Sequence, residues 1–218
     1  MLHLHHANRL EDLAEKLRRN LETPLSEVLT PEIIAVPGTA ISEWLTIRLA
    51  AETGISANIR WLLPARLLWQ IFRDTLDEVP DSNAFSADAL AWRVLPALDD
   101  ATFTSRHSAL SRYLKDSNEL HRWQLARQMG RLYEQYLVFR PDWVIDWERG
   151  DAAYWQGALW QRLISEGDTR HWLRWRNQLL DRLKARSISD GALPERLSLF
   201  ALTGLSPAFL ELISTVAR

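Results

Sequence analysis

The stretch EIIAVPGTAISEWLTIRLA, residues 32–50, constrains the fold more strongly than any other part of this chain. Four consecutive apolar residues, 33–36, predict a short buried strand, and Pro37-Gly38 ends it. Thr39 is expected to cap a helix over residues 39–53, because a threonine hydroxyl accepts a backbone N–H at that position. The helix has one apolar face, formed by Ile41, Trp44, Leu45 and Leu49. Many nucleotide-binding enzymes hold a phosphate in such a strand–turn–helix.

The neighbouring segments place this unit in an α/β fold. Residues 2–7 alternate as a short strand, and residues 8–22 have leucines at helical spacing. Residues 54–61 predict a further extended stretch, and residues 64–78 predict a helix. Parallel strands need a crossover connection, usually a helix. A strand, a helix and a second strand with its own helix therefore favour parallel pairing.

The middle of the chain predicts helices only. Five segments between about residue 86 and residue 186 have helical periodicity: 86–100, 105–115, 119–139, 155–165 and 170–186. Residues 196–204 then predict a buried return strand. Residues 206–218 predict a final helix with Pro207 in its first turn.

These elements predict three parts of the chain. Residues 1–85 form a first α/β part, residues 86–190 a large helical insertion, and residues 191–218 the return strand and helix. Three short strands are a small sheet for so many helices, and the last helix needs a sheet to pack against. We therefore expect an incomplete sheet whose remaining strands lie beyond Arg218, so that the chain is a fragment.

Composition limits the function classes. The 218 residues carry a formal net charge of −2, which gives no overall attraction to nucleic acid. The absence of cysteine excludes disulfides and thiolate metal sites. No signal peptide is recognisable, and no apolar run approaches the roughly 20 residues that span a bilayer. We therefore expect a cytoplasmic protein with no membrane partner.

Two compositional biases have more than one explanation. The chain has 11 tryptophans, and its arginines greatly outnumber its lysines. Tryptophan suits stacking on bases, and arginine suits bidentate contact with phosphate. An aromatic-rich core and a codon-biased genome would produce the same composition, so both interpretations stay open.

The turn after the first buried strand lacks the chemistry needed to bind ATP. A P-loop surrounds the phosphates with glycine N–H groups, adds a lysine and places a Ser/Thr on magnesium. Here the turn is Pro37-Gly38-Thr39-Ala40, and no lysine lies between Lys16 and Lys115. We expect no nucleotide at this turn. The free N–H groups at the helix start either face a phosphate of nucleic acid or belong to an ordinary β–α turn.

No set of catalytic or metal-binding residues is recognisable. His3, His5 and His6 have no acidic neighbour that would complete a metal site. Neither a Gly-x-Ser-x-Gly nor an HExxH pattern occurs. The acidic residues of RPDWVIDWERG, residues 140–150, are expected to be helix caps and surface charges. The sequence therefore predicts no catalytic residue, no cofactor and no metal.

The stretch RHWLRWRNQLLDRLKAR, residues 170–186, is the most basic segment. Its arginines are interleaved with Trp172 and Trp175, and helical spacing puts Arg170 and Arg174 on one face. Such a pattern is typical of a helix that follows a phosphate backbone and supports bases. It is equally typical of a solvated face above an aromatic core, and the sequence leaves both open.

The segment QYLVFRPDWVIDWERG, residues 135–150, resembles the N-terminal part of the RecC family, the gamma chains of exodeoxyribonuclease V. The segments HHANRLEDL, VPGTAISEWL, GISANIRWLLPARLLWQIF and LFALTGLSPAFLELI resemble the same family in register. The resemblance implies a RecA-like P-loop fold of the superfamily 1 helicase type, domain 1A, with a 1B-like helical insertion. It also implies that the nucleotide motif is degenerate.

The resemblance further implies a role. The family works in double-strand-break repair as the non-catalytic subunit of the RecBCD helicase–nuclease, beside RecB-like and RecD-like motors that carry the ATPase and nuclease activities. The implied ligands are forked duplex and single-stranded DNA. The 3′-ended strand passes through a channel in which the Chi sequence is recognised. The DNA-contacting positions that keep the family's residues are Thr39, Leu63, Trp69, Leu132, Gln135 and Arg140, together with Arg174, for which Arg176 is the alternative.

Four positions depart from the family pattern. Pro37 and Glu43 stand where the family has glutamine, and Arg131 and Glu134 stand where it has aspartate. Glu43, Arg131 and Glu134 stay in the expected DNA-facing set. A proline side chain forms no hydrogen bond with a base edge, and a glutamate only accepts. Either the recognised DNA word differs in this chain, or recognition is lost while strand guidance is retained.

Two other functions stay open at this point. The chain is alternatively a protein-interaction scaffold that holds the two motors without touching DNA, since arginine and tryptophan are also enriched in interface hot spots. The β–turn–α unit alone is also compatible with an ATP-dependent helicase domain that has an unusual phosphate loop.

Overall fold

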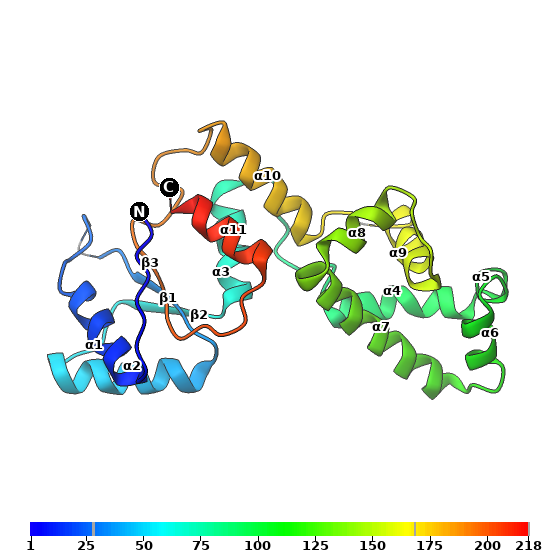
Figure 1. The fold of residues 1–218 in the computed structure, drawn as a ribbon, viewed down its shortest axis with the longest axis horizontal. Coiled ribbons are helices and arrows are strands. Elements are labelled where there is room, and N and C mark those ends of the chain that lie inside the picture. The colour runs from blue at the N-terminus through cyan, green and yellow to red at the C-terminus, as the bar shows by residue number, and fades with distance from the viewer. Residues whose placement is uncertain (28, 168, 218) are drawn as a thin grey trace. The chain divides into compact units, whose positions relative to one another are not determined.

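The fold is mixed α/β, with a small parallel sheet and many helices (Figure 1). The computed structural model describes residues 1–27, 29–167 and 169–217. Along this part of the chain the elements are α1 (Leu10–Leu21), β1 (Glu32–Ala35), α2 (Thr39–Thr53), β2 (Ile59–Leu62), α3 (Pro64–Thr75), α4 (Ala87–Asp99), α5 (Ala101–Ser105), α6 (Ser108–Leu114), α7 (Glu119–Phe139), α8 (Pro141–Glu148), α9 (Trp155–Ser165), α10 (Trp172–Lys184), β3 (Leu197–Leu199) and α11 (Pro207–Val216).

The chain divides into two compact units. The α/β unit comprises Met1–Val79, Gln178–Leu205 and Phe209–Arg218. The helical unit comprises Pro80–Asn177 and Ser206–Ala208. The α/β unit is therefore assembled from stretches that lie far apart in the sequence.

The sheet of the α/β unit is parallel, as the sequence predicts. Strand β1 lies in the middle and pairs with β2 on one side and β3 on the other. The crossovers from β1 to β2 and from β2 to β3 run in opposite directions. Because such crossovers are right-handed, their helices cover opposite faces of the sheet. Figure 1 shows α1 and α2 on one side of the sheet, and α3 and α11 on the other.

The core between the sheet, α1 and α2 follows from the alternation of β1. Ile34 and Val36 are buried and point to the face that Leu17 of α1 and Leu45 of α2 cover. Phe200, directly after β3, joins the same cluster. The predicted bounds of α2 and its apolar face are confirmed, because Leu45 and Leu49 are buried.

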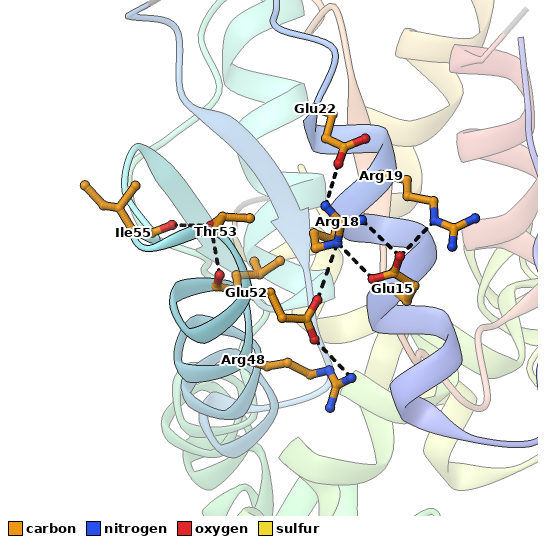
Figure 2. A network of polar contacts seen from close by, with 9 residues as sticks. Glu15, Arg18, Arg19, Glu22, Arg48, Glu52, Thr53 and Ile55 are labelled. Carbon is orange, nitrogen blue, oxygen red and sulfur yellow. Dashed lines mark hydrogen bonds and ion pairs between the residues drawn. The ribbon is translucent and has the colours of Figure 1, made fainter.

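Polar contacts join α1 to α2 at the rim of this core (Figure 2). Arg18 binds Glu15 at 2.8 Å and Glu22 at 2.5 Å within α1. Its Nε lies 3.4 Å from Glu52 of α2, which also pairs with Arg48 at 3.1 Å. Arg18 thus connects the two helices.

The helical unit is built around the antiparallel pair α4 and α7. Gly130 of α7 lies directly against the backbone of Ala87 and Ala91 on α4. Two large aromatic side chains, Tyr133 and Trp160, are fully buried in the core of this unit. The Tyr133 hydroxyl donates to the Gln156 carbonyl at 2.6 Å, so the buried phenol is satisfied.

The prediction of a strand over residues 2–7 is wrong. Residues 1–6 are exposed and have no regular structure. An alternating pattern of apolar residues and histidines forms a strand only where a neighbouring strand supplies hydrogen bonds. In the described part of the chain, the edges of the sheet belong to β2 and β3. Helices α5 and α8 lie largely outside the segments for which the sequence predicted helices.

Candidate nucleic-acid interface

Two of the predicted contact positions lie at the carboxyl edge of the sheet. Because β1 and β2 are parallel neighbours, the chain leaves both strands at the same edge. The N–H of Val36 donates to the Leu62 carbonyl at 2.9 Å, and the turn to Thr39 begins there. Leu63 follows β2 directly and is 41% exposed. Ligands of open α/β sheets bind outside this edge, so the position suits a binding role.

Thr39 does not cap α2, contrary to the sequence prediction. Gly38 holds the N-cap position with extended dihedrals, and Thr39 is the first residue of the helix. The Gly38 carbonyl accepts from the N–H groups of Ile41 and Ser42. An N-cap residue has non-helical dihedrals, whereas Thr39 is the first residue of the helix and so does not occupy the capping position. The exposed Thr39 hydroxyl stands instead beside the first N–H groups of the helix, which have no acceptor within it.

Glu43 lies one turn further along α2, on the side of Thr39. Its side chain is exposed and lines an open depression. The lining residues come from α2 and β2: Ser42, Glu43, Thr46, Ile47 and Trp61. Sequence reasoning did not single out Trp61. A tryptophan next to the exposed Arg60 in a strand was the available signal.

Trp69 lies on α3 and is partly buried. Its ring meets the fully buried Phe72 edge-on, with centroids 6.2 Å apart and an angle of 74° between the planes. A rigid core residue therefore supports the indole, which retains some exposed surface. Such a ring is suited to stacking.

Four predicted contacts lie within one stretch of α7. Arg131, Glu134 and Gln135 are exposed and share one helix face, at spacings of three and four residues. Leu132 is partly buried and packs against the core of the helical unit. The helix therefore presents hydrogen-bonding groups of three kinds to solvent: a guanidinium, a carboxylate and a carboxamide.

Arg140 is held at the junction of α7 and α8. Its Nε and Nη2 donate to the two carboxylate oxygens of Asp142, at 3.1 and 2.8 Å. The guanidinium carbon lies 3.6 Å from the centroid of the Trp143 ring, a cation–π geometry. The hydrogen bonds with Asp142 raise the pKa of Arg140 and lower that of Asp142. Arg140 is thus pre-positioned, and a phosphate would have to share it with Asp142.

Arg174 takes part in a cluster around Glu148. Its Nη2 lies 3.1 Å from Oε2 of Glu148, whose Oε1 is 2.6 Å from Nε2 of the buried His171. Trp160 Nε1 donates to the same carboxylate at 3.4 Å. Burial raises the pKa of Glu148, but the hydrogen bond from His171 and the charge of Arg174 outweigh it, so that this pKa is lowered. The prediction that Glu148 is a surface charge is therefore wrong.

The alternative to Arg174 has a different environment. Arg176 is partly buried, and its Nε donates to the Ala208 carbonyl at 3.1 Å. Arg174 keeps its side chain 47% exposed beside Glu148. Arg174 therefore has the more accessible guanidinium of the two.

The ten predicted positions fall into two groups, one in each unit. The α/β unit holds Thr39, Glu43, Leu63 and Trp69, and the helical unit holds Arg131, Leu132, Glu134, Gln135, Arg140 and Arg174. Each remains a predicted DNA contact. Residues 1–27, 29–167 and 169–217 contain no group of three side chains from His, Asp or Glu that would hold a metal. Over the same residues, no helix has the length and apolar character required to cross a membrane.

The class of protein follows from these features together with comparison to known sequences. The chain has a three-stranded parallel sheet, a β1–turn–α2 unit without lysine, and a mainly helical second unit. A family model described as RecC, N-terminal domain, matches residues 2–218. The chain therefore belongs to the RecC N-terminal domain family, which confirms the resemblance.

Individual relatives agree with this assignment. The chain is 29% identical to the RecBCD enzyme subunit RecC of Escherichia coli (strain K12), over 100% of the chain and 21% of that protein. It is 30% identical to the RecBCD enzyme subunit RecC of Mycolicibacterium smegmatis, over 99% of the chain and 20% of that protein. The chain thus spans about a fifth of the length of the curated relatives it matches.

Proposed function

We propose that this chain is the N-terminal, non-catalytic DNA-binding part of a RecBCD-type helicase–nuclease. It guides the 3′-ended single strand produced from forked duplex DNA at a double-strand break. The observation that carries the proposal is the family match over residues 2–218. RecB-like and RecD-like subunits are its partners, the ATPase and nuclease activities lie on them, and the complex works in the cytoplasm.

Within this proposal the fold is RecA-like. Residues 1–85 form the first part of an inactive 1A domain, residues 86–190 a 1B-like insertion, and residues 191–218 the return strand and helix. The parallel order β2-β1-β3 and the β1–turn–α2 unit support this view. Where a P-loop continues with Gly-Lys-Ser/Thr, this chain has Thr39-Ala40-Ile41, so a scaffold role is favoured over ATP binding.

Recognition of a Chi-like sequence is the finer part of the proposal. The exposed side chains that would recognise bases are Glu43, Arg131, Glu134 and Gln135. Each good bidentate base contact contributes about 1–3 kcal/mol of discrimination. A stacked base on Trp69 would add about 1–3 kcal/mol without sequence preference. The changed residue types therefore favour a word other than that of relatives with glutamine or aspartate at these positions.

The test uses the full-length subunit assembled with its RecB-like and RecD-like partners. Trp69→Ala, Gln135→Ala and Arg140→Ala are expected to lower processivity of strand degradation or to abolish the response to a recombination site. Arg106→Ala, an exposed arginine outside the predicted set, serves as the control. Unchanged processivity and response in all three variants would contradict the channel role.

A scaffold without DNA contact is the second candidate. It is favoured by the exposed Trp92, which is 64% exposed and whose ring centroid lies 4.5 Å from that of the partly buried Trp123. A salt series separates the two functions. Binding of single-stranded DNA through several arginines weakens steeply as salt rises. A scaffold that does not touch DNA would show no such binding.

A further inference from the structure

The guanidinium of Arg174 is held by a carboxylate from another helix of the same unit. Glu148, the last residue of α8, lies with Oε2 3.1 Å from Nη2 of Arg174 on α10. The Glu148 side chain is only 17% exposed, whereas that of Arg174 is 47% exposed. The carboxylate therefore anchors one side of the guanidinium, and the remaining surface of Arg174 is open to solvent.

The core of the helical unit fixes this carboxylate. Oε1 of Glu148 lies 2.6 Å from Nε2 of His171, whose side chain is 2% exposed. Because a carboxylate only accepts, Nε2 is the donor. The imidazole packs edge-on against the buried Phe85, with ring centroids 5.4 Å apart, and its centroid lies 5.8 Å from that of Trp160. Neither Glu148 nor His171 can therefore turn without disturbing buried aromatic rings.

A carboxylate at this position is unfavourable for helix α8 alone. The carboxyl end of a helix carries partial negative charge, and burial removes hydration from an ionised group. Burial raises the pKa of Glu148, but the hydrogen bond from His171 and the charge of Arg174 outweigh burial, so the group is ionised at neutral pH. The two partners thus offset the cost of the charge, one inside the core and one at the surface.

An arginine with a fixed direction differs from a mobile one in how it binds a phosphate. A long side chain loses rotamer freedom when it is immobilised, and this loss weakens binding. Arg174 has already lost part of that freedom through its contact with Glu148. The negative charge of Glu148 acts in the opposite direction, because it repels a phosphate. Position and charge therefore have opposite effects on DNA binding, and a measurement can separate them.

We propose that Glu148, fixed by His171, is a positioning residue for Arg174. It holds the guanidinium in the direction in which Arg174 contacts a phosphate of the single strand, and neither Glu148 nor His171 touches the DNA. The inference rests on the proposed function, in which Arg174 is a DNA contact. It goes beyond that function by assigning a role to two residues outside the DNA-contacting set.

The experiment uses the full-length subunit assembled with its RecB-like and RecD-like partners. Fluorescence anisotropy without ATP measures the binding of a labelled forked duplex with a 3′ single-stranded thymidine tail. Glu148→Asp keeps the charge but is one methylene shorter, so its carboxylate no longer reaches both His171 and Arg174. It is expected to weaken binding about three- to tenfold, the range set by ordering one long side chain. Glu148→Gln, in which one oxygen accepts from only one partner, should weaken binding too, whereas lost repulsion alone would strengthen it.

Arg174→Ala separates positioning from a loss of stability. Arg174→Ala alone is expected to weaken binding. In the Arg174→Ala background, neither replacement of Glu148 should weaken binding further, because no guanidinium is left to position. A weakening that persists in this background would mean that Glu148 acts through the stability of the helical unit, and would overturn the inference.

Glu166→Asp serves as the matched control, because Glu166 is an exposed carboxylate of the same unit that pairs with Arg162 at 2.9 Å. This replacement should leave binding unchanged. Unchanged binding by Glu148→Asp, or by Arg174→Ala, overturns the positioning role. The proposed function stands in that case as long as Trp69→Ala or Arg140→Ala weakens binding. Unchanged binding in all of these variants contradicts the proposed function as well.

Discussion

At the scale of single residues, Gly130 allows helices α4 and α7 of the helical unit to pack at close distance. A Cβ at this position would overlap the carbonyl oxygen of Ala87 and lie 3.0 Å from the backbone N of Ala91. Backbone atoms cannot move aside as a flexible side chain can. Gly130→Ala is therefore expected to lower the free energy of unfolding by about 1–3 kcal/mol, the usual cost of overpacking. This result would follow even though alanine favours a helix by about 1 kcal/mol over glycine.

Urea unfolding followed by circular dichroism measures this change. Gln128→Ala is the control, because Gln128 is exposed on the same helix and its replacement should change the free energy of unfolding by no more than about 0.5 kcal/mol. A Gly130→Ala chain as stable as the original would mean that α4 and α7 can separate without cost, contrary to the close approach in the structure.

The contacts of Glu148 could not be predicted from the sequence. The sequence indicated that RPDWVIDWERG and RHWLRWRN carry charges next to tryptophans. It gave no means of pairing Glu148 with His171, which lies 23 residues further along the chain. Only packing in the core of the helical unit brings this carboxylate and this imidazole together. The sequence thus indicated which charged residues lie near tryptophans, but not which side chains they contact.

At the scale of elements, periodicity over long segments gave correct predictions. Helices α2, α7 and α9 begin and end where the apolar pattern does. Short segments failed for a physical reason, since their structure depends on a neighbour. Residues 2–7 alternate but have no strand to pair with, whereas β3 is only three residues long and forms because β1 lies beside it. Helix α8 begins with Pro141 and was not predicted, because a proline indicates a break in a helical pattern as readily as the first turn of a new helix.

Another property of elements is the contact between α1 and α2 through Arg18. Hydrogen bonds from Arg18, and next from Arg19, lower the pKa of Glu15 from 4.5 to about 2. Arg18→Gln is expected to raise the pKa of Glu15 only part of the way back, because Arg19 still donates to Glu15 at 2.8 Å. Carboxyl NMR titration of Glu15 measures the change. Because the folded-state pKa of Glu15 is depressed, its hydrogen bonds with Arg18 and Arg19 within α1 stabilise the fold above about pH 4.5, and this contribution is lost as pH falls towards about 2.

The control for this experiment is Arg9→Gln. Arg9 is an exposed arginine that approaches Glu11 at 3.7 Å and takes no part in the network of Figure 2. It should leave the Glu15 titration unchanged. A pKa near 4.5 in the unmodified chain would show that the arginines do not hold Glu15, and α1 would then depend on its apolar contacts alone.

At the scale of the whole molecule, the α/β unit depends on contacts between distant parts of the sequence. Arg196, just before β3, donates to the Asn20 and Thr23 carbonyls and pairs with Glu32 at the start of β1. Ser26 donates to Glu195 through both its N–H and its hydroxyl. The segment around β3 therefore completes the sheet, and its residues Glu195 and Arg196 also form hydrogen bonds with the connection between α1 and β1.

A chain that ends at Lys184 tests this dependence, because it lacks β3 and α11 while residues Pro80–Asn177 stay in place. Amide hydrogen exchange is expected to rise at Glu32–Ala35, where the hydrogen bonds from β1 to β3 and the burial of Phe200 are lost. Protection in α4 and α7 should persist, since their contacts lie within the helical unit. If α4 and α7 lost protection to the same extent as β1, the two units would fold as one cooperative structure. If β1 kept its protection, β2, α1 and α2 would suffice to hold it.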